Sequence, residues 1–523
     1  MADRSREHRL ALIPLFAVLV AYYGWLLTSG NVRKFFMETS FGLTFNSMLV
    51  HLLHGRFDVD PASVGIEGFL RDGKVYAYWG IFCSLLRLPL LLWHDAIKRD
   101  VTVLSCFAAV CVAAYFKLRS LLLAARFSPP SPGRNLILGA LGAWMLFGGA
   151  QVGYLYAAIY HEVIFWAAVM ASVFSYVALR GLLRREFSLA ALCWMATLSG
   201  LAVLTRVSTG IGLCTALVLL LGILIREDST RQGEAPLIAR LCRAALRPRV
   251  VIPIAILCLG VAIAGLINFE RWGNPLVFHD YQYYLLNRGY PDRLIRTQTY
   301  GQFNLERVPF GLIYYFFPLW VLHRPDGNLF FSEYRERLID SAELPPASFL
   351  LTDALPILLL SLLCWRWTLQ RRLKSELPER TPARSQSIAI AAGLAVPALL
   401  MLTAISMTYR YRMEFSPFFE ISGLLALVYL SRDRPVRELS AGLRYSILTA
   451  VTVGVVASHL ALAMYKLSPL SPGQHYLQNG IVKLYVSCLA SKQRNPRSML
   501  HSTSPFGQTR PSEVAKDSVP GCE

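Results

Sequence analysis

The most regular feature of the sequence is a series of apolar runs separated by short polar loops. A helix of about 20 apolar residues, rising about 1.5 Å per residue, crosses the hydrocarbon core of a bilayer. The pattern therefore predicts an all-α, polytopic transmembrane helical bundle. We predict about eleven spans, at residues 10–28, 101–116, 136–152, 163–179, 189–205, 207–225, 250–268, 350–367, 387–405, 415–430 and 445–465.

Two further apolar segments interrupt the alternation of the loops. Residues 76–93 contain Arg87 and Pro89, and residues 308–322 contain two prolines and many aromatic side chains. Counting only one of them as a span would move every later loop to the opposite side of the membrane. We predict that both are juxtamembrane or re-entrant elements at the interface, where Tyr and Trp are enriched. If both spanned, the total would be about 13.

Composition and charge agree with a membrane protein. The 523 residues are 54% hydrophobic and only 16% charged, whereas a soluble domain carries about 25% charged residues. Six loops hold 25 Lys and Arg against 10 Asp and Glu, which is +15 of the formal +19. This positive-inside pattern predicts a multi-pass protein of the cell inner (plasma) membrane, with a cytoplasmic N-terminus and the C-terminus outside. It also argues against a nucleic-acid partner. The six loops are residues 1–9, 117–135, 180–187, 226–249, 368–386 and 431–444.

This topology divides the chain into two parts. Residues 1–466 form the transmembrane domain, and its two large outer loops are residues 29–100 and 269–349. Residues 467–523 form a polar C-terminal tail. Its Ser/Pro/Gln-rich part, residues 492–523, is predicted to be disordered because it has too few apolar residues to form a core.

The first outer loop holds the candidate catalytic carboxylates. Residues 44–54 place apolar side chains at helical spacing, which predicts an amphipathic helix on the membrane surface. Glu38, Asp58 and Asp60 flank it, and a carboxylate at the membrane edge can act as a general base or hold a divalent cation. The alternative is a solvated loop with turn-forming aspartates.

Two short stretches offer further ionisable groups. His161 and Glu162 lie where a short outer loop meets a helix, and ionisable residues there are candidates for function. Glu162 could instead simply favour the helix N-terminus. Arg410 and Arg412 flank Tyr411 in a very short outer loop, which suits a phosphate group. The alternative partner for these arginines is Glu414 or another loop carboxylate.

The second outer loop offers a candidate sugar site. Arg271, Trp272 and Tyr281 could stack on a sugar or flank a lipid headgroup, although an ordinary aromatic belt would look similar. No Walker A, GxGxxG, HExxH or GxSxG motif is present, and no cysteine cluster has metal-ligand spacing. No cofactor is therefore certain and no residue is assigned to a metal, while a divalent cation held by carboxylates stays open.

Several stretches, taken in order, resemble the GT-C superfamily of membrane glycosyltransferases, which includes the protein O-mannosyltransferases and the aminoarabinose transferases that modify lipid A. FNSMLVHLLHGRFDVD resembles the amphipathic stretch after the first span, and DGKVYAYWGIFCSLLRLPLLLW resembles the segment before the second. YHEVIFWA resembles the start of the fourth span. GLAVLTR, NFERWGNPLVF and YRYRMEFSP resemble three further recurrent stretches. The resemblance extends to about Lys466.

The resemblance implies a polyprenyl-phosphate sugar donor, an inverting transfer and an active site at the outer face. It also implies a carboxylate in the first outer loop, in many members an Asp about eight residues before a small residue. Ser47 occupies the position of that small residue in this sequence, but no Asp lies between Ser29 and Arg56. Glu38 is the best substitute.

The resulting hypothesis is a membrane glycosyltransferase that moves a sugar from a lipid-linked donor to a lipid, glycan or protein acceptor at the outer face. Its other partner is membrane lipid. Two alternatives remain. One is a non-catalytic protein of the same fold in bacterial cell-envelope polysaccharide assembly. The other is a lipid or solute transporter, which the scarcity of charge expected inside the spans disfavours.

Overall fold

The computed structural model describes residues 2–93, 95–230, 236–317, 337–342, 347–372, 382–432, 436 and 440–467. The predicted C-terminal tail, apart from Leu467, lies outside these residues, as do parts of the second outer loop.

A helix occupies each of the eleven predicted spans, so the chain is a polytopic helical membrane protein. The helices are α1 (Ala2–Thr28), α5 (Thr102–Phe127), α6 (Pro132–Phe147) with α7 (Gly149–Gly153), α8 (Ile159–Arg184), α9 (Leu189–Val203), α10 (Val207–Thr230), α12 (Pro248–Trp272), α16 (Phe349–Thr352) with α17 (Ala354–Arg372), α18 (Arg384–Thr403), α19 (Ser416–Leu430) and α21 (Ala441–Leu467). Among the described residues, eight helices are long and apolar enough to cross a membrane by length and composition. The apolar parts of α1, α9 and α17 are shorter.

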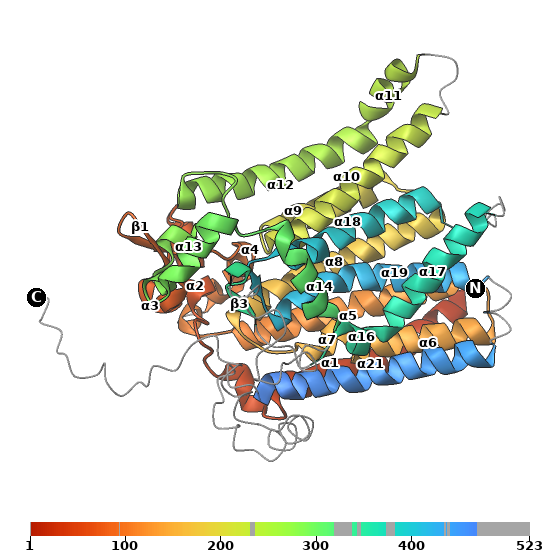
Figure 1. Ribbon diagram of the computed structural model, residues 1–523, viewed down its shortest axis with the longest axis horizontal. Coiled ribbons are helices and arrows are strands. Elements are labelled where there is room, and N and C mark those ends of the chain that lie inside the picture. The colour runs from red at the N-terminus through yellow and green to blue at the C-terminus, as the bar shows by residue number, and fades with distance from the viewer. Residues whose placement is uncertain are drawn as a thin grey trace, which may run out of the picture.

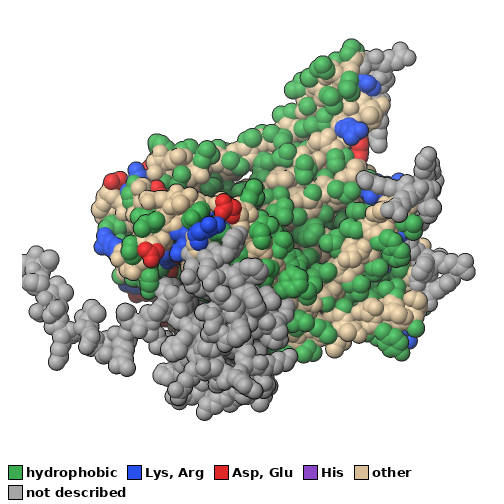
Figure 2. All heavy atoms as spheres, in the orientation of Figure 1, with side chains coloured by type: hydrophobic (Ala, Val, Ile, Leu, Met, Phe, Trp, Pro, Cys, Tyr) green, Lys and Arg blue, Asp and Glu red, His purple; other side chains and the backbone are tan. Residues whose placement is uncertain are grey.

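The helices run side by side between two ends of the bundle (Figure 1). The short elements gather at one end, which we call the loop end, while α11 (Leu237–Ala245) lies at the opposite end. Figure 2 shows charged side chains mainly near the two ends and hydrophobic side chains between them. The elements of the loop end include α2 (Thr44–Leu53), α3 (Pro61–Val64), α4 (Phe82–Leu85), α13 (Pro291–Tyr300) and α14 (Val308–Phe316).

Two small sheets also form. β1 (Phe69–Arg71) pairs with β2 (Lys74–Tyr76) as an antiparallel hairpin. β3 (Ser341–Ala342) pairs in parallel with β4 (Ser406–Met407), which joins the second outer loop to the end of α18.

The two ambiguous apolar segments form short elements in the part that the structure describes. Residues 76–93 break into α4 and a 3₁₀ helix at Leu88–Leu92 that begins before Pro89, so they form no spanning helix, as predicted. In the other segment, α14 is nine residues long, and the residues after Phe317 lie outside the described ranges.

The predicted amphipathic helix exists as α2, but its predicted place on the membrane surface is wrong. Phe45 and Met48 are fully buried, and Leu49 is nearly so. The Phe45 ring packs edge-on against Trp79, at 6.3 Å between ring centroids. The apolar face of α2 therefore packs against the protein itself, because the loop end supplies an apolar surface that the helix covers.

The expectation of almost no buried charge in the spans is also wrong. The sequence pattern placed Lys117 in a loop, whereas α5 continues to Phe127 and buries it. Lys117 Nζ lies 2.6 Å from Glu420 Oε1 of α19 and donates to Gln151 Oε1 at 2.7 Å. A buried ammonium is tolerated when a carboxylate pairs with it. The argument against a transporter therefore loses its charge-based support.

The orientation of the bundle remains a prediction that fusions can test. A reporter fused after Arg240, between α10 and α12, should report the cytoplasm, and one fused after Gln478 should report the outside. The physical reason is the +15 that the six predicted inner loops carry. Activity of a phosphatase and a fluorescent-protein reporter at each site gives the measurement. Both fusions reporting the same compartment would contradict the predicted topology.

Candidate functional site

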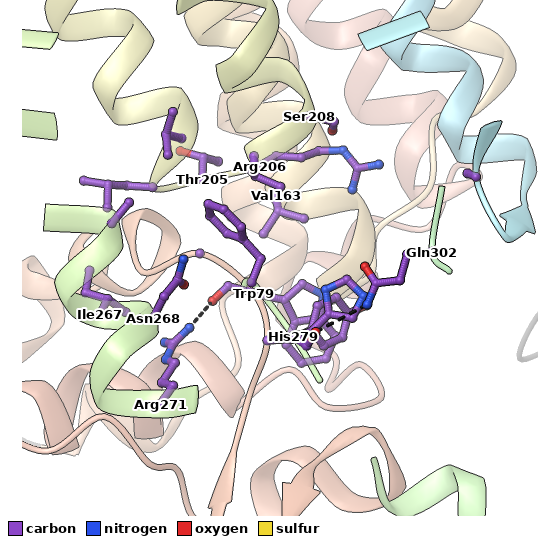
Figure 3. Close-up of a pocket in the computed structure, with 18 of the residues that line it drawn as sticks. Trp79, Val163, Thr205, Arg206, Ser208, Ile267, Asn268, Arg271, His279 and Gln302 are labelled. Atoms are coloured by element: carbon purple, nitrogen blue, oxygen red, sulfur yellow. Dashed lines mark hydrogen bonds between the residues drawn. The ribbon is translucent and has the colours of Figure 1, made fainter. Parts of the chain in front are cut away.

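A cavity of about 180 Å³ opens at the loop end of the bundle (Figure 3). It lies where the turn between α9 and α10, the C-terminal part of α12 and the end of α18 approach residues 78–81. The helices supply an apolar wall that includes Val163, Val203, Ile267 and Met401. The site therefore combines an apolar wall from the helices with polar groups from helix ends and loops.

The polar groups of the cavity come from segments far apart in the sequence. Arg206 comes from the α9–α10 turn, Ser208 from the start of α10 and Asn268 from α12, while His279 and Gln302 come from the second outer loop. No Asp or Glu occurs among the described residues that line it. The lining is therefore cationic or neutral, which suits a ligand that carries negative charge.

Arg271 is held at the end of α12 by one hydrogen bond to a backbone carbonyl and one to the Met48 sulfur. The helix ends at Gly273, which adopts a φ of +72°, a conformation that favours glycine. Arg271 is buried, and its Nη1 donates to the Trp79 carbonyl at 3.0 Å (Figure 3). Its Nε has no hydrogen-bond partner among the described residues. The guanidinium is thus fixed in place but retains a donor, which could bind an acceptor atom of a ligand.

Aromatic rings surround His279 in the cavity. Tyr78 lies 5.7 Å and Tyr281 5.1 Å from the imidazole, between ring centroids. Gln302 Nε2 donates to the His279 carbonyl at 3.3 Å. Burial lowers the pKa of His279 to about 4, so the imidazole is neutral near pH 7. A neutral ring can donate one hydrogen bond and accept another, which suits sugar hydroxyls.

The 3₁₀ helix at Tyr409–Phe415 directs the three charged side chains of the predicted arginine loop toward different partners. Arg410 lies over the Tyr160 ring, 4.6 Å from its centroid. Glu414 forms an ion pair with Arg206, and it accepts hydrogen bonds at 2.9 Å from Ser208 and from Thr209. The alternative that Glu414 pairs with Arg410 or Arg412 is therefore wrong, because Arg206 and the first turn of α10 supply its partners.

Arg412 is the least compensated of these side chains. It is fully buried, and Nη2 donates to the Tyr314 carbonyl at 3.0 Å, while the guanidinium carbon lies 4.9 Å from the Phe349 ring centroid. Neither Nε nor Nη1 has a hydrogen-bond partner among the described residues. The Tyr154 hydroxyl is close enough to the guanidinium to interact with it, although the two groups do not meet in hydrogen-bonding geometry. Because unpaired buried donors cost free energy, this arrangement indicates an unfilled requirement for an acceptor.

Glu162 and His161 begin α8 but do not line the cavity. Both carboxylate oxygens of Glu162 accept from Arg87, one at 2.9 Å from Nη2, and both side chains are fully buried. His161 Nε2 lies 3.0 Å from the Tyr465 hydroxyl. Glu162 is thus occupied by an ion pair, and only the next residue, Val163, reaches the cavity.

The carboxylates of the first outer loop lie outside the cavity lining as well. Asp60 accepts from Ser47 Oγ at 2.8 Å, and His51 lies between Asp60 and Asp58, at 3.3 Å from each. Burial raises the pKa of Asp58, but hydrogen bonds from Arg56 and His51 outweigh it and lower the pKa to about 2. Asp58 is therefore a poor base at neutral pH.

Glu38 is exposed and lies beside an anchored turn. The amide and the hydroxyl of Thr39 donate to Asp100, at 2.6 and 2.7 Å. Asp100 also accepts from the Thr102 amide at the start of α5, at 2.8 Å. The turn that carries Glu38 is thus anchored at the N-terminus of α5, while the side chain of Glu38 stays accessible.

The structure brings part of the predicted site together. Arg271, Tyr281 and Tyr411 line the cavity, whereas Trp272 packs in a separate aromatic cluster beside Phe69, at 5.4 Å between ring centroids. Several polar residues of the lining were not among the site residues predicted from the sequence. The one sign of these residues in the sequence was Arg206, an isolated arginine in a short outer loop that otherwise lacks basic residues. These unpredicted residues include Arg206, Ser208, Asn268, His279 and Gln302.

A cation site of protein ligands does not form in the part of the chain that the structure describes. No group of three or more His, Cys, Asp or Glu side chains there is arranged to hold a metal ion.

No protein-family model and no curated protein matches this chain. Among solved structures, the chain is similar to the oligosaccharyltransferase of Archaeoglobus fulgidus in its apo form, with 13% sequence identity and a TM-score of 0.47. The match covers 89% of this chain but only 59% of the length of the archaeal one. The same protein, named AglB, in complex with an inhibitory peptide and a dolichol-phosphate, is similar at 12% identity and a TM-score of 0.44, over 89% and 59% of the two chains.

Proposed function

We propose that this protein is a membrane glycosyltransferase that takes a sugar from a polyprenyl-phosphate carrier and transfers it to an acceptor at the loop end. The observation that carries the proposal is the cavity at that end, which has an apolar wall within the helices and a rim of aromatic and guanidinium groups. A lipid-linked sugar has three matching parts, an isoprenoid chain, a phosphate and a sugar. The stretches that resemble the GT-C superfamily supply much of this rim.

The aromatic groups are suited to the sugar. Tyr78, Tyr281 and Tyr411 line the cavity and offer flat apolar faces with hydroxyl groups at their edges. Asn268 and Gln302 add amide groups, although each uses one donor on a backbone carbonyl. Such a set of directional polar groups on an apolar wall would select a polyhydroxylated ligand.

The guanidinium groups are suited to the phosphate. Arg271 and Arg412 each retain a donor without a partner among the described residues, and the Arg410 guanidinium carbon lies 5.7 Å from the ring centroid of Tyr411, which lines the cavity. Negative charge grows on the phosphate as the glycosidic bond breaks, and fixed donors stabilise that charge. Neither Arg410 nor Arg412 is among the described lining residues, but both adjoin Tyr411, which is, and we assign them to the leaving phosphate.

The acceptor requires a base from outside the described lining. Glu38 is the best candidate because it is accessible at the loop end and its turn is anchored through Asp100. Asp58 and Asp60 are weaker candidates, since His51, Arg56 and Ser47 occupy their oxygens. Glu162 would act only by positioning, through Arg87. No step is assigned to a cation.

The test compares envelope glycans and lipids of a strain that lacks this protein with those of the wild type. We expect the deletion strain to lose one sugar from an envelope component, with the unmodified acceptor accumulating. Arg271→Ala and Tyr411→Ala should reproduce the loss, because both residues line the cavity. The control is Arg288→Ala, an exposed arginine that does not line it. Identical glycan and lipid profiles in the deletion and the wild type would contradict the proposal.

A second candidate is a non-catalytic protein that binds the same lipid-linked sugar during polysaccharide assembly. The absence of Asp and Glu from the described cavity lining favours it. Purified protein distinguishes the two, because an enzyme releases the carrier phosphate when acceptor is added, whereas a binding protein retains the intact donor. Glu38→Gln should abolish that release if Glu38 is the base.

A further inference from the structure

The end of the bundle opposite the cavity carries a helix whose exposed face is apolar. α11 connects α10 to α12 and projects beyond the neighbouring helices (Figure 1). Ala244 is its buried contact with the protein. Ile238 is 76% exposed, and Cys242, one turn later on the same face, is exposed too. Leu246, directly after the helix, is 75% exposed and extends this stripe.

Basic side chains border the stripe. Arg243 is exposed, and its described hydrogen bond is to a carbonyl of its own helix, from Nε to Ala239 at 3.4 Å. Arg247 and Arg249 share one carboxylate, Asp228, at 3.0 and 3.6 Å. The region 226–249 holds six arginines against three acidic residues, so positive charge remains beside the apolar face.

The apolar stripe continues into an exposed apolar surface of α12. Val251 and Ile252 at the start of α12 are 44% and 41% exposed, and α12 is an apolar candidate membrane span. Figure 2 shows hydrophobic side chains along the part of the molecule formed by α11 and the adjoining end of α12, and Lys or Arg side chains toward its tip. A short helix between two spans, apolar on one side and basic beside it, matches an element that lies in the headgroup layer.

We propose that α11 is a lipid-binding element that docks in the headgroup layer of its leaflet and binds anionic phospholipids through Arg243 and its neighbours. The apolar stripe inserts beside the acyl chains, while the guanidinium groups contact the phosphates. This inference is independent of the proposed transferase activity, because it concerns the other end of the bundle.

Cys242 provides a reporter on the stripe itself. The full-length protein, with its other accessible cysteines replaced by alanine, is labelled at Cys242 with an environment-sensitive fluorophore and kept in a neutral detergent. Addition of phosphatidylglycerol should shift the emission to shorter wavelength, whereas phosphatidylcholine should produce little shift. Raising NaCl to about 0.5 M should weaken the response, since salt screens exposed charges.

Two substitutions separate the charge from the apolar face. Arg243→Gln should raise the phosphatidylglycerol concentration at half-response about fivefold, the contribution of one basic residue near an anionic surface. Ile238→Gln should reduce the size of the shift, because the stripe inserts less deeply. Arg288→Gln, an exposed arginine at the loop end, is the matched control and should change neither quantity.

Three outcomes would overturn the inference. The first is an equal response to phosphatidylcholine and phosphatidylglycerol. The second is an unchanged half-response concentration in Arg243→Gln. The third is a label already shielded before lipid is added, which would indicate that a second copy or another part of the protein covers the stripe. Because the described contact of Arg243 is within its own helix, its replacement should leave the bundle folded.

Discussion

Replacing Glu162 by glutamine should lower the free energy of unfolding by about 3 to 5 kcal/mol, the usual cost of breaking a buried ion pair. Arg87 would remain fully buried and lose the carboxylate that accepts from two of its nitrogens. Asn46 Oδ1 and Ser105 Oγ, both 3.3 Å from guanidinium nitrogens, are neutral and too weak to compensate. Denaturant titration of the purified protein in mixed micelles gives the measurement.

The double variant Arg87→Met with Glu162→Met is the control for this prediction. It removes both charges and keeps apolar volume at the junction of α4 and α8, so most of the lost stability should return. A Glu162→Gln variant that is as stable as the wild type but inactive would instead indicate a catalytic carboxylate. Measuring donor turnover on the same variants therefore separates positioning from catalysis.

Arg412→Met should have opposite effects on stability and on ligand binding. The ligand-free protein should be as stable as the wild type or more stable, by up to about 4 kcal/mol, because a buried and poorly paired charge is removed. Affinity for a polyprenyl-phosphate sugar should fall about 10- to 150-fold, since a charge-assisted phosphate contact contributes about 1.5 to 3 kcal/mol. Thermal unfolding and donor binding, measured on the same preparation, test both halves.

Arg307 is the matched control for Arg412, because it is an equally buried arginine whose donors are used by the fold. Its guanidinium donates to the carbonyls of Leu338 and Gly301 at 2.8 Å, and also to two further carbonyls. Arg307→Met should therefore destabilise the protein by several kcal/mol, leaving those carbonyls unpaired. If Arg412→Met destabilised it to the same degree and left donor affinity unchanged, Arg412 would be structural.

Arg412→Lys separates the role of the positive charge from the role of the guanidinium geometry. It keeps the positive charge but lacks the planar fork that binds two phosphate oxygens at once, so it should restore donor affinity only in part. Arg410→Ala tests the neighbouring group, which lies over Tyr160. Unchanged donor binding in the variant that lacks both arginines would remove the phosphate role from this loop.

The helical spans could be predicted from the sequence because membrane crossing depends on a local property. A run of about 20 apolar residues must satisfy its backbone groups within the lipid, and a helix does so without help from distant residues. Pro89 and Arg87 likewise marked residues 76–93 as a segment that does not span. The local pattern failed at α2, whose amphipathic face is compatible with a membrane surface or with a protein core, and only the packing around Phe45 and Met48 decides between them.

The partners of the charged residues were decided by the tertiary structure. Arg87 and Glu162 lie 75 positions apart, and Arg206 and Glu414 lie 208 apart, so no periodicity links them. Lys117 could enter the bundle only because Glu420 meets it from α19. The cavity needs residues from α8 to α10, α12, α18 and both outer loops. Apolar runs fix where helices form, but burial of a charge depends on which side chain faces it, and helix packing alone determines that.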